Sequence, residues 1–223
     1  MIHLFNPENK FWQFIGKLTD VACMSILWVV TSLPLFTIGA STTAFYKFTL
    51  RQVQNTEGSV WKSYFTAFKT YFKKATLLWL IQLAGTAFFV VDLWAAWSFF
   101  LVQGGVPGIA VLGLCGCFAI LFLSCCFYVY PLLAALDFPL KKLLSNSFIL
   151  AVGNLPVTVT LIVMTALVGV AIFYLSGFFF FWIGLFIFIS SYFIFGVFLK
   201  YTGGDEDEGS EAAAPVDDEK WLV

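Results

Sequence analysis

Five long apolar runs dominate this chain, and each is long enough to cross a lipid bilayer as a helix. They cover residues 15–38, 75–102, 109–136, 155–175 and 178–199. A helix needs about 20 apolar residues to cross the hydrocarbon layer, which is about 30 Å thick. Hydrophobic residues make up 61% of the 223 positions and charged residues only 11%, roughly half the charge of a soluble domain. We therefore expect a membrane protein.

The apolar runs predict helices rather than strands. Backbone groups inside a bilayer must be hydrogen-bonded within the protein, so only helices and closed barrels cross it. The runs show no alternation at barrel-strand length. The predicted fold class is all-α: a polytopic transmembrane helical bundle of about five spans over residues 1–202. Residues 203–223 carry eight of the thirteen acidic residues and predict a disordered acidic tail.

Lysine and arginine are distributed unevenly among the connections, which predicts the orientation. Ten of the twelve basic residues fall between spans one and two, between spans three and four, or after span five. The positive-inside rule places these segments and the C-terminus in the cytoplasm of a multi-pass cell-membrane protein. Five spans then put the N-terminus outside. Residues 33–50 offer an alternative as a second, re-entrant or short span, which puts the N-terminus inside. The cluster of Ser41, Thr42 and Thr43 is typical of a helix cap, and this favours five spans.

Residues 60–74 predict an amphipathic helix at the membrane surface. At about 100° per residue its aromatic side chains share one face and its lysines lie on the opposite face. Such a helix suits an interface with anionic lipid on the cytoplasmic side; alternatively, the aromatic face packs beneath the bundle. The candidate lipid or partner surface comprises Trp61, Lys62, Lys69, Lys73 and Lys74. Residues 140–150 repeat the pattern more weakly.

Four polar residues within or beside the apolar runs are candidate intramembrane sites, because a carboxylate in lipid usually marks an interior face or a pathway. Asp20 lies near the start of the first run, where it can instead reach the headgroups. Gln82 and Asp92 lie in the second run. Asp92 is either a buried functional acid or part of an outer aromatic belt with Trp94 and Trp97. Asp137 lies between two prolines and is expected to cap the following helix.

The sequence holds no recognisable catalytic set. His3 is the single histidine, and no phosphate-binding loop or Ser/His/Asp set is present. All five cysteines lie inside apolar runs, and the pair Cys115 and Cys117 has no further ligands at zinc spacing. We expect no enzyme, no cofactor, no metal and no nucleic-acid partner.

Four sequence blocks resemble a known family. They are FNPENKFWQFIGKLTD, ILWVVTSLPLFTIGASTTAFY, WKSYFTAFKTYFKKATLLWL and YPLLAALDFPLKKLLSNS. Together they are similar to the YesL family of small bacterial membrane proteins, also known as DUF624, over roughly residues 3–200. The most specific block spans residues 32–46 and includes Pro34, Gly39, Ser41 and Tyr46. Two positions depart from the family pattern: Ser25 stands where an asparagine is frequent, and Ala135 where a basic residue is frequent.

The resemblance implies a role beside sugar uptake, because members of this family are typically encoded near carbohydrate ABC importers and glycoside hydrolases in Gram-positive bacteria. The leading hypothesis is a non-enzymatic accessory membrane protein of such an importer, with its permease subunits as partners. A second hypothesis is a small transporter or channel that uses Asp92 and Gln82. A third is a scaffold or regulatory protein at the membrane surface.

Overall fold

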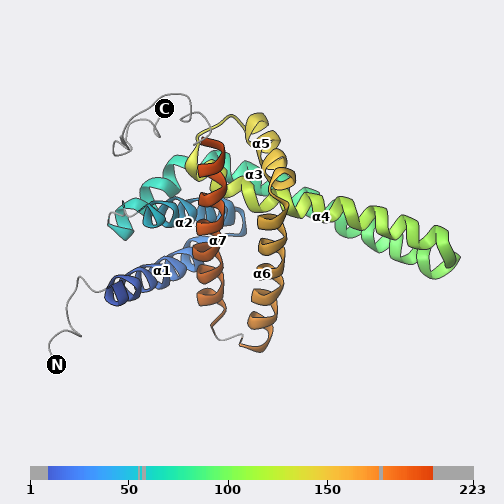
Figure 1. The fold of residues 1–223 in the computed structure, drawn as a ribbon, viewed down its shortest axis with the longest axis horizontal. Helices are drawn as coiled ribbons and strands as arrows, with labels where there is room; N and C mark the ends of the chain where they lie inside the picture. The colour runs from blue at the N-terminus through green and yellow to red at the C-terminus, as the bar shows by residue number, and fades with distance from the viewer. Residues whose placement is uncertain (1–9, 55, 57–58, 176–177, 203–223) are drawn as a thin grey trace.

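The fold consists of helices joined by short connections. The computed structural model describes residues 10–54, 56, 59–175 and 178–202, and Figure 1 shows their arrangement. The elements are α1 (Lys10–Ser32), the short 3-10 helix η2 (Leu35–Thr37), α2 (Ile38–Val53), α3 (Val60–Gln103), α4 (Gly105–Ala135), α5 (Leu140–Gly153), α6 (Leu155–Tyr174) and α7 (Phe179–Thr202). No strand occurs in these ranges. The predicted all-α fold is confirmed, and the acidic tail lies outside the described residues.

Five helical stretches have the length and hydropathy of membrane spans. They are Ile15–Ser32, Val60–Gln103, Gly105–Ala135, Leu155–Tyr174 and Phe179–Tyr201. The number of spans agrees with the predicted five, but the bounds of the first two spans differ from the predicted ones. The amphipathic stretch at residues 60–74 and the second span form one uninterrupted helix of 44 residues, α3. The weaker amphipathic pattern becomes α5, with Leu143, Ser147 and Leu150 buried and Lys141 and Lys142 exposed.

The sequence predicted a first span that extends to Ile38, but the helix ends before that residue. Helix α1 ends at Ser32 because the ring of Pro34 disfavours helical geometry in the residue before it and donates no backbone hydrogen bond. The predicted cap at residues 41–43 is also wrong, since α2 begins at Ile38. The hydroxyls of Ser41, Thr42 and Thr43 bond instead to the carbonyls four residues earlier within α2.

Helices α1 and α2 form an antiparallel hairpin from Lys17 to the turn at Pro34. Near its open end, Lys17 Nζ donates to the Gln52 carbonyl at 3.1 Å and Gln52 Nε2 donates to the Lys17 carbonyl at 3.3 Å. Near its closed end, Trp28 Nε1 donates to Thr42 Oγ1 at 3.1 Å. The start of α1 and the end of α2 therefore lie together. This arrangement favours the alternative in which residues 33–50 return toward the side of the N-terminus.

The remaining long helices form two further hairpins. Helix α3 turns into α4 at Gly104, which adopts a φ of 59° that glycine accommodates without strain. Helices α6 and α7 pack together as a third hairpin. In Figure 1 the α3–α4 pair extends to one side, and the α6–α7 pair lies across it. The closed turns at residues 33–37, 104 and 175–178 carry no charged residue.

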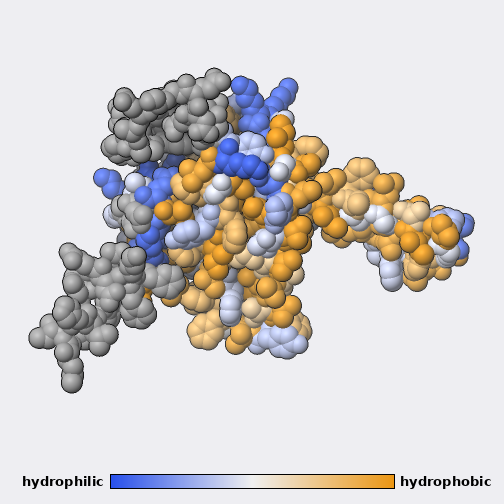
Figure 2. Space-filling model, viewed as in Figure 1, coloured by the Kyte–Doolittle hydropathy of each residue, from blue (hydrophilic) through white to orange (hydrophobic). Residues whose placement is uncertain are grey.

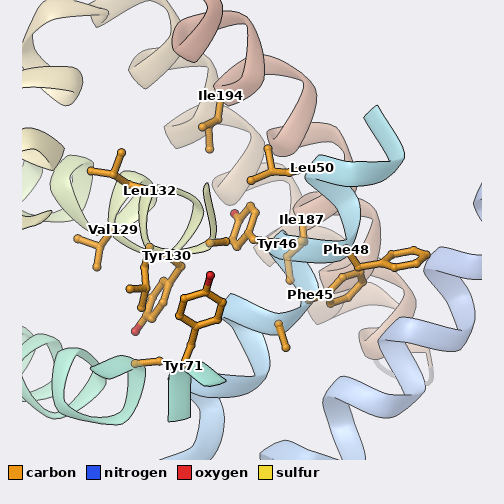
Figure 3. Close-up of a cluster of buried hydrophobic side chains, with 14 of the residues drawn as sticks. Phe45, Tyr46, Phe48, Leu50, Tyr71, Val129, Tyr130, Leu132, Ile187 and Ile194 are labelled. Atoms are coloured by element: carbon orange, nitrogen blue, oxygen red, sulfur yellow. The ribbon is translucent and has the colours of Figure 1, made fainter. Parts of the chain in front are cut away.

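Helix α2 is the centre of the fold. It packs against α1, α3, α4 and α7, and Phe45, Phe48 and Leu50 are buried among their side chains. Figure 3 shows Tyr46, Tyr71 and Tyr130 meeting in this cluster with Ile187 of α7. The outer parts of α3 and α4 instead project away from this centre as a two-helix arm (Figure 1). The arm is covered with exposed apolar side chains (Figure 2), as expected of helices whose solvent is lipid.

Close contacts between backbones depend on two glycines. A Cβ on Gly39 would lie 2.8 Å from Trp79 Cβ and would collide with the Ala75 carbonyl of α3. A Cβ on Gly184 of α7 would collide with Ser25 Oγ of α1. Small residues are how helices in lipid approach each other closely. Ser25, one of the two departures from the family pattern, therefore occupies a helix crossing, where its hydroxyl bonds to the Val21 carbonyl.

Replacing Gly39 by alanine is expected to destabilise the protein by about 1–3 kcal/mol, because α2 must move away from the α3 backbone to accept the methyl group. Gly113→Ala is the matched control, since Gly113 is also helical and no atom lies within 4 Å of its built Cβ. Thermal unfolding of the purified protein in detergent measures both. Equal melting temperatures for the two variants would contradict the proposed packing of α2 on α3.

Candidate functional site: a basic surface at the open end of the hairpins

The N-terminal half of α3 has one buried face and one exposed face. Tyr64, Ala67 and Tyr71 are buried at helical spacing against the core. Trp61 and Phe65 are 62% and 40% exposed although both are large and apolar. The sequence left two alternatives for this helix, a helix at the lipid interface or one packed beneath the bundle, and each describes part of it. One edge of its aromatic face packs against the bundle, and the other edge is uncovered.

Lysines border the uncovered aromatic edge. Lys62, Lys69 and Lys73 are exposed on α3. One open depression is lined by Trp61, Lys62, Phe65, Thr66 and Lys69, and a second by Phe68, Lys69, Thr70, Phe72, Lys73 and Lys74. We call the set Trp61, Lys62, Phe65, Lys69 and Lys73 the α3 outer face. Its mixture of rings and ammonium groups suits a lipid headgroup region or an acidic protein surface.

Lys74 is turned toward the protein and contacts Asp137. The Lys74 ammonium lies 2.5 Å from Asp137 Oδ1, which joins α3 to the connection between α4 and α5. The expected capping role of Asp137 is wrong: α5 follows Pro139 as its N-cap, without a side-chain capping bond. Both partners are partly exposed, so the pair contributes little to stability and serves to position the two charges.

Two basic residues of α2 complete this group, and the sequence analysis did not select them. Lys47 and Arg51 lie one helical turn apart on α2. Burial lowers the pKa of Lys47, the neighbouring Arg51 lowers it further, and Asp137 opposes both effects. Arg51 and Asp137 also act electrostatically on the hydroxyl of Tyr71. We call Lys47, Arg51, Tyr71, Lys74 and Asp137 the junction cluster. The i, i+4 spacing of Lys47 and Arg51 was the available signal.

The polar residues of the spans are engaged in contacts between helices. Gln82 Oε1 accepts a hydrogen bond from the Tyr130 hydroxyl at 2.6 Å, joining α3 to α4. Asp92 lies within hydrogen-bonding reach of the Cys115 thiol on the same pair of helices. Neither residue lines the two depressions described above. Asp20 is partly buried on α1, three residues after Lys17, and is far in the fold from the arm that holds Asp92.

The residues of the family block have structural positions around α2. Pro34 lies at the start of the first hairpin turn, directly before η2, and Gly39 allows α2 to approach α3. Ser41 lies 3.0 Å from Thr31 of α1, whose hydroxyl is also within 2.5 Å of the Tyr64 hydroxyl on α3. The Tyr46 hydroxyl bonds to Ser190 of α7 at 3.0 Å. The block therefore ties α2 to three neighbouring helices.

The described residues contain no group of three or more His, Cys, Asp or Glu side chains that could hold a metal ion. The five cysteines are free thiols. What the geometry offers is a set of cations and aromatic rings near the open ends of the α1–α2 and α3–α4 hairpins (Figure 1). This arrangement suits the binding of an anionic partner.

The fold and this surface define a polytopic helical membrane protein with a basic, aromatic-bordered end. Residues 21–93 match the family described as "Protein of unknown function, DUF624", which confirms the resemblance over this part of the chain. The matched segment contains the second half of α1, all of α2, the α3 outer face and Lys74. No curated protein and no solved structure matches the chain.

Tyr46→Phe is expected to destabilise the protein by about 1 kcal/mol, because the buried hydrogen bond between α2 and α7 is lost, while Ser190 keeps only its bond to the Ile187 carbonyl. Tyr192→Phe is the control on the same helix as Ser190, since Tyr192 is 45% exposed. Thermal unfolding in detergent should lower the melting temperature for the first variant only. A Tyr46→Phe protein as stable as the wild type would show that this contact does not hold α2 in place.

Proposed function

We propose that this protein is a non-enzymatic accessory protein of the membrane that docks a partner on the α3 outer face. The observation that supports the proposal is the exposure of Trp61 and Phe65 on a helix whose opposite face is packed into the core. Exposed aromatic residues bordered by cations are typical of binding surfaces. The family resemblance suggests the partner: the permease subunits of a carbohydrate ABC importer.

Affinity purification in mild detergent tests the proposal. The wild-type protein should recover the permease subunits, and a deletion strain should take up oligosaccharide more slowly than the parent. The double substitution Trp61→Ala with Phe65→Ala should reduce recovery by about tenfold or more, as expected when an aromatic anchor of an interface is removed. Trp94→Ala is the control, because Trp94 is at least as exposed as Trp61 but lies on the arm. Recovery of the protein alone, with normal uptake in the deletion strain, would contradict the proposal.

The same lysines favour a second candidate, a scaffold or regulatory protein at the membrane surface. Attraction to an anionic surface is worth about 1 kcal/mol for each nearby lysine, and Lys62, Lys69 and Lys73 are all exposed. The purification distinguishes the two candidates, since a scaffold of this kind would recover anionic lipid without permease subunits. The transporter hypothesis has less support, because Gln82 and Asp92 are used in contacts between α3 and α4.

We further propose that the open ends of the α1–α2 and α3–α4 hairpins face the cytoplasm, with both the start of α1 and the C-terminus on that side. The antiparallel α1–α2 pair brings Lys17 to Gln52, and the basic residues of the described part lie toward the open ends, whereas the turns carry none. The positive-inside rule then assigns the side. This proposed orientation places the N-terminus inside, whereas a chain with five crossings would have it outside.

Cysteine labelling in intact cells tests this orientation on a background without the five native cysteines. Single cysteines at Leu35 and Gly104 should react with an impermeant maleimide, because both lie at closed turns. Cysteines at Asn9, Asn55 and Ser210 should react only after the cells are permeabilised. Reaction at Asn9 in intact cells would restore the external N-terminus, and reaction at Asn55 would remove the proposed cytoplasmic docking surface.

A further inference from the structure

The junction cluster carries more positive than negative charge. It contains the three cations Lys47, Arg51 and Lys74 but the single carboxylate Asp137. The other two acidic residues of the described part are elsewhere: Asp20 is on α1, and Asp92 is on the arm. Lys47 and Arg51 lie one turn apart on α2, and Asp137, which contacts Lys74, also acts on Lys47, so the three cations surround one carboxylate.

Lys47 is the residue that most requires a negative partner. It is only partly exposed, and no hydrogen bond or ion pair within the described residues reaches its ammonium group. Its neighbour Arg51 repels it, and Asp137, which attracts it, already pairs with Lys74. A partly buried cation of this kind is stabilised most by an anion placed between it and the adjacent cation.

The chemistry of the cluster suits a phosphate group. The planar guanidinium of Arg51 can donate two parallel hydrogen bonds to phosphate oxygens, and the lysines add point charges. The hydroxyl of Tyr71, which lies in the field of both Arg51 and Asp137, can donate a further bond. Trp61 and Phe65, exposed on the same end of α3, are side chains that favour the headgroup level of a bilayer.

We propose that Lys47, Arg51 and Lys74 form a binding site for a phosphate group, carried by the headgroup of an anionic phospholipid, at the junction of α2, α3 and α4. Asp137 holds Lys74 and competes with the phosphate for it. The site differs from the α3 outer face, because two of its three cations belong to α2. It does not depend on the docking of a protein partner. Its proposed role is to bind the headgroup of one anionic phospholipid.

Titration of the full-length protein in detergent with short-chain phosphatidylglycerol tests the proposal. Lys47→Gln and Arg51→Gln should each weaken binding by about tenfold, the loss expected for one charge-assisted contact. Lys200→Gln, an exposed lysine of α7 that belongs to neither the junction cluster nor the α3 outer face, should bind like the wild type. Asp137→Asn should bind more tightly, because it removes the competing carboxylate. Misfolding can lower the affinity of a variant but cannot raise it. A gain of affinity in Asp137→Asn therefore reports on the binding site itself.

Two parallel titrations identify the carrier of the phosphate. Short-chain phosphatidylcholine should bind at least tenfold more weakly, because its quaternary amine meets the same cations. Binding of inorganic phosphate as tight as that of phosphatidylglycerol would retain the site but replace the lipid by free phosphate. Equal binding of the two lipids, or wild-type affinity in both Lys47→Gln and Arg51→Gln, would overturn the proposal. Detergent exposes both ends of the protein, so these outcomes are independent of the labelling and purification experiments.

Discussion

Helix α2 can occupy the centre of this protein only because its hydroxyl groups find partners there. Surrounded by apolar helices, a hydroxyl that bonds to nothing costs free energy. The hydroxyls of α2 bond along its own backbone and to neighbours: Ser41 to Thr31 of α1, and Tyr46 and Thr49 to Ser190 and Ser191 of α7. The same helix approaches α3 closely at Gly39. The remaining helices are arranged around these contacts.

Composition and periodicity were enough to predict the helical membrane fold, the number of long apolar helices and the amphipathic start of α3. These properties depend on local apolar content and on spacing along one helix, which the sequence displays directly. The end of the first span was missed, since apolar residues continue on both sides of Pro34 and hide the turn. The role of α2 was also missed. A run with one serine, several threonines and a lysine looks like a connection until the structure shows that its hydroxyls are paired.

Part of the candidate site was likewise predicted from the sequence, and part was not. The lysines and exposed rings of α3 follow from the period of a single helix and were predicted. Lys47 and Arg51 could not be assigned to the same place, because that depends on how α2 packs on α3 and α4. Asp137 was assigned to a cap from its flanking prolines, whereas the tertiary fold brings Lys74 within reach. Pairings between distant segments depend on tertiary packing, which a single sequence does not show.

The continuity of α3 has a mechanical consequence. Its 44 residues make a rod of about 66 Å, which begins among the lysines and ends at the tip of the arm (Figure 1). Gly85, the one glycine within it, is not a free hinge, because the ring of Phe122 on α4 lies against the position of its missing Cβ. Helix α3 is therefore expected to move as one rigid body. A tilt imposed at Trp61 is carried along the helix to the arm, so that any molecule bound at one end pushes on the lipid around the other.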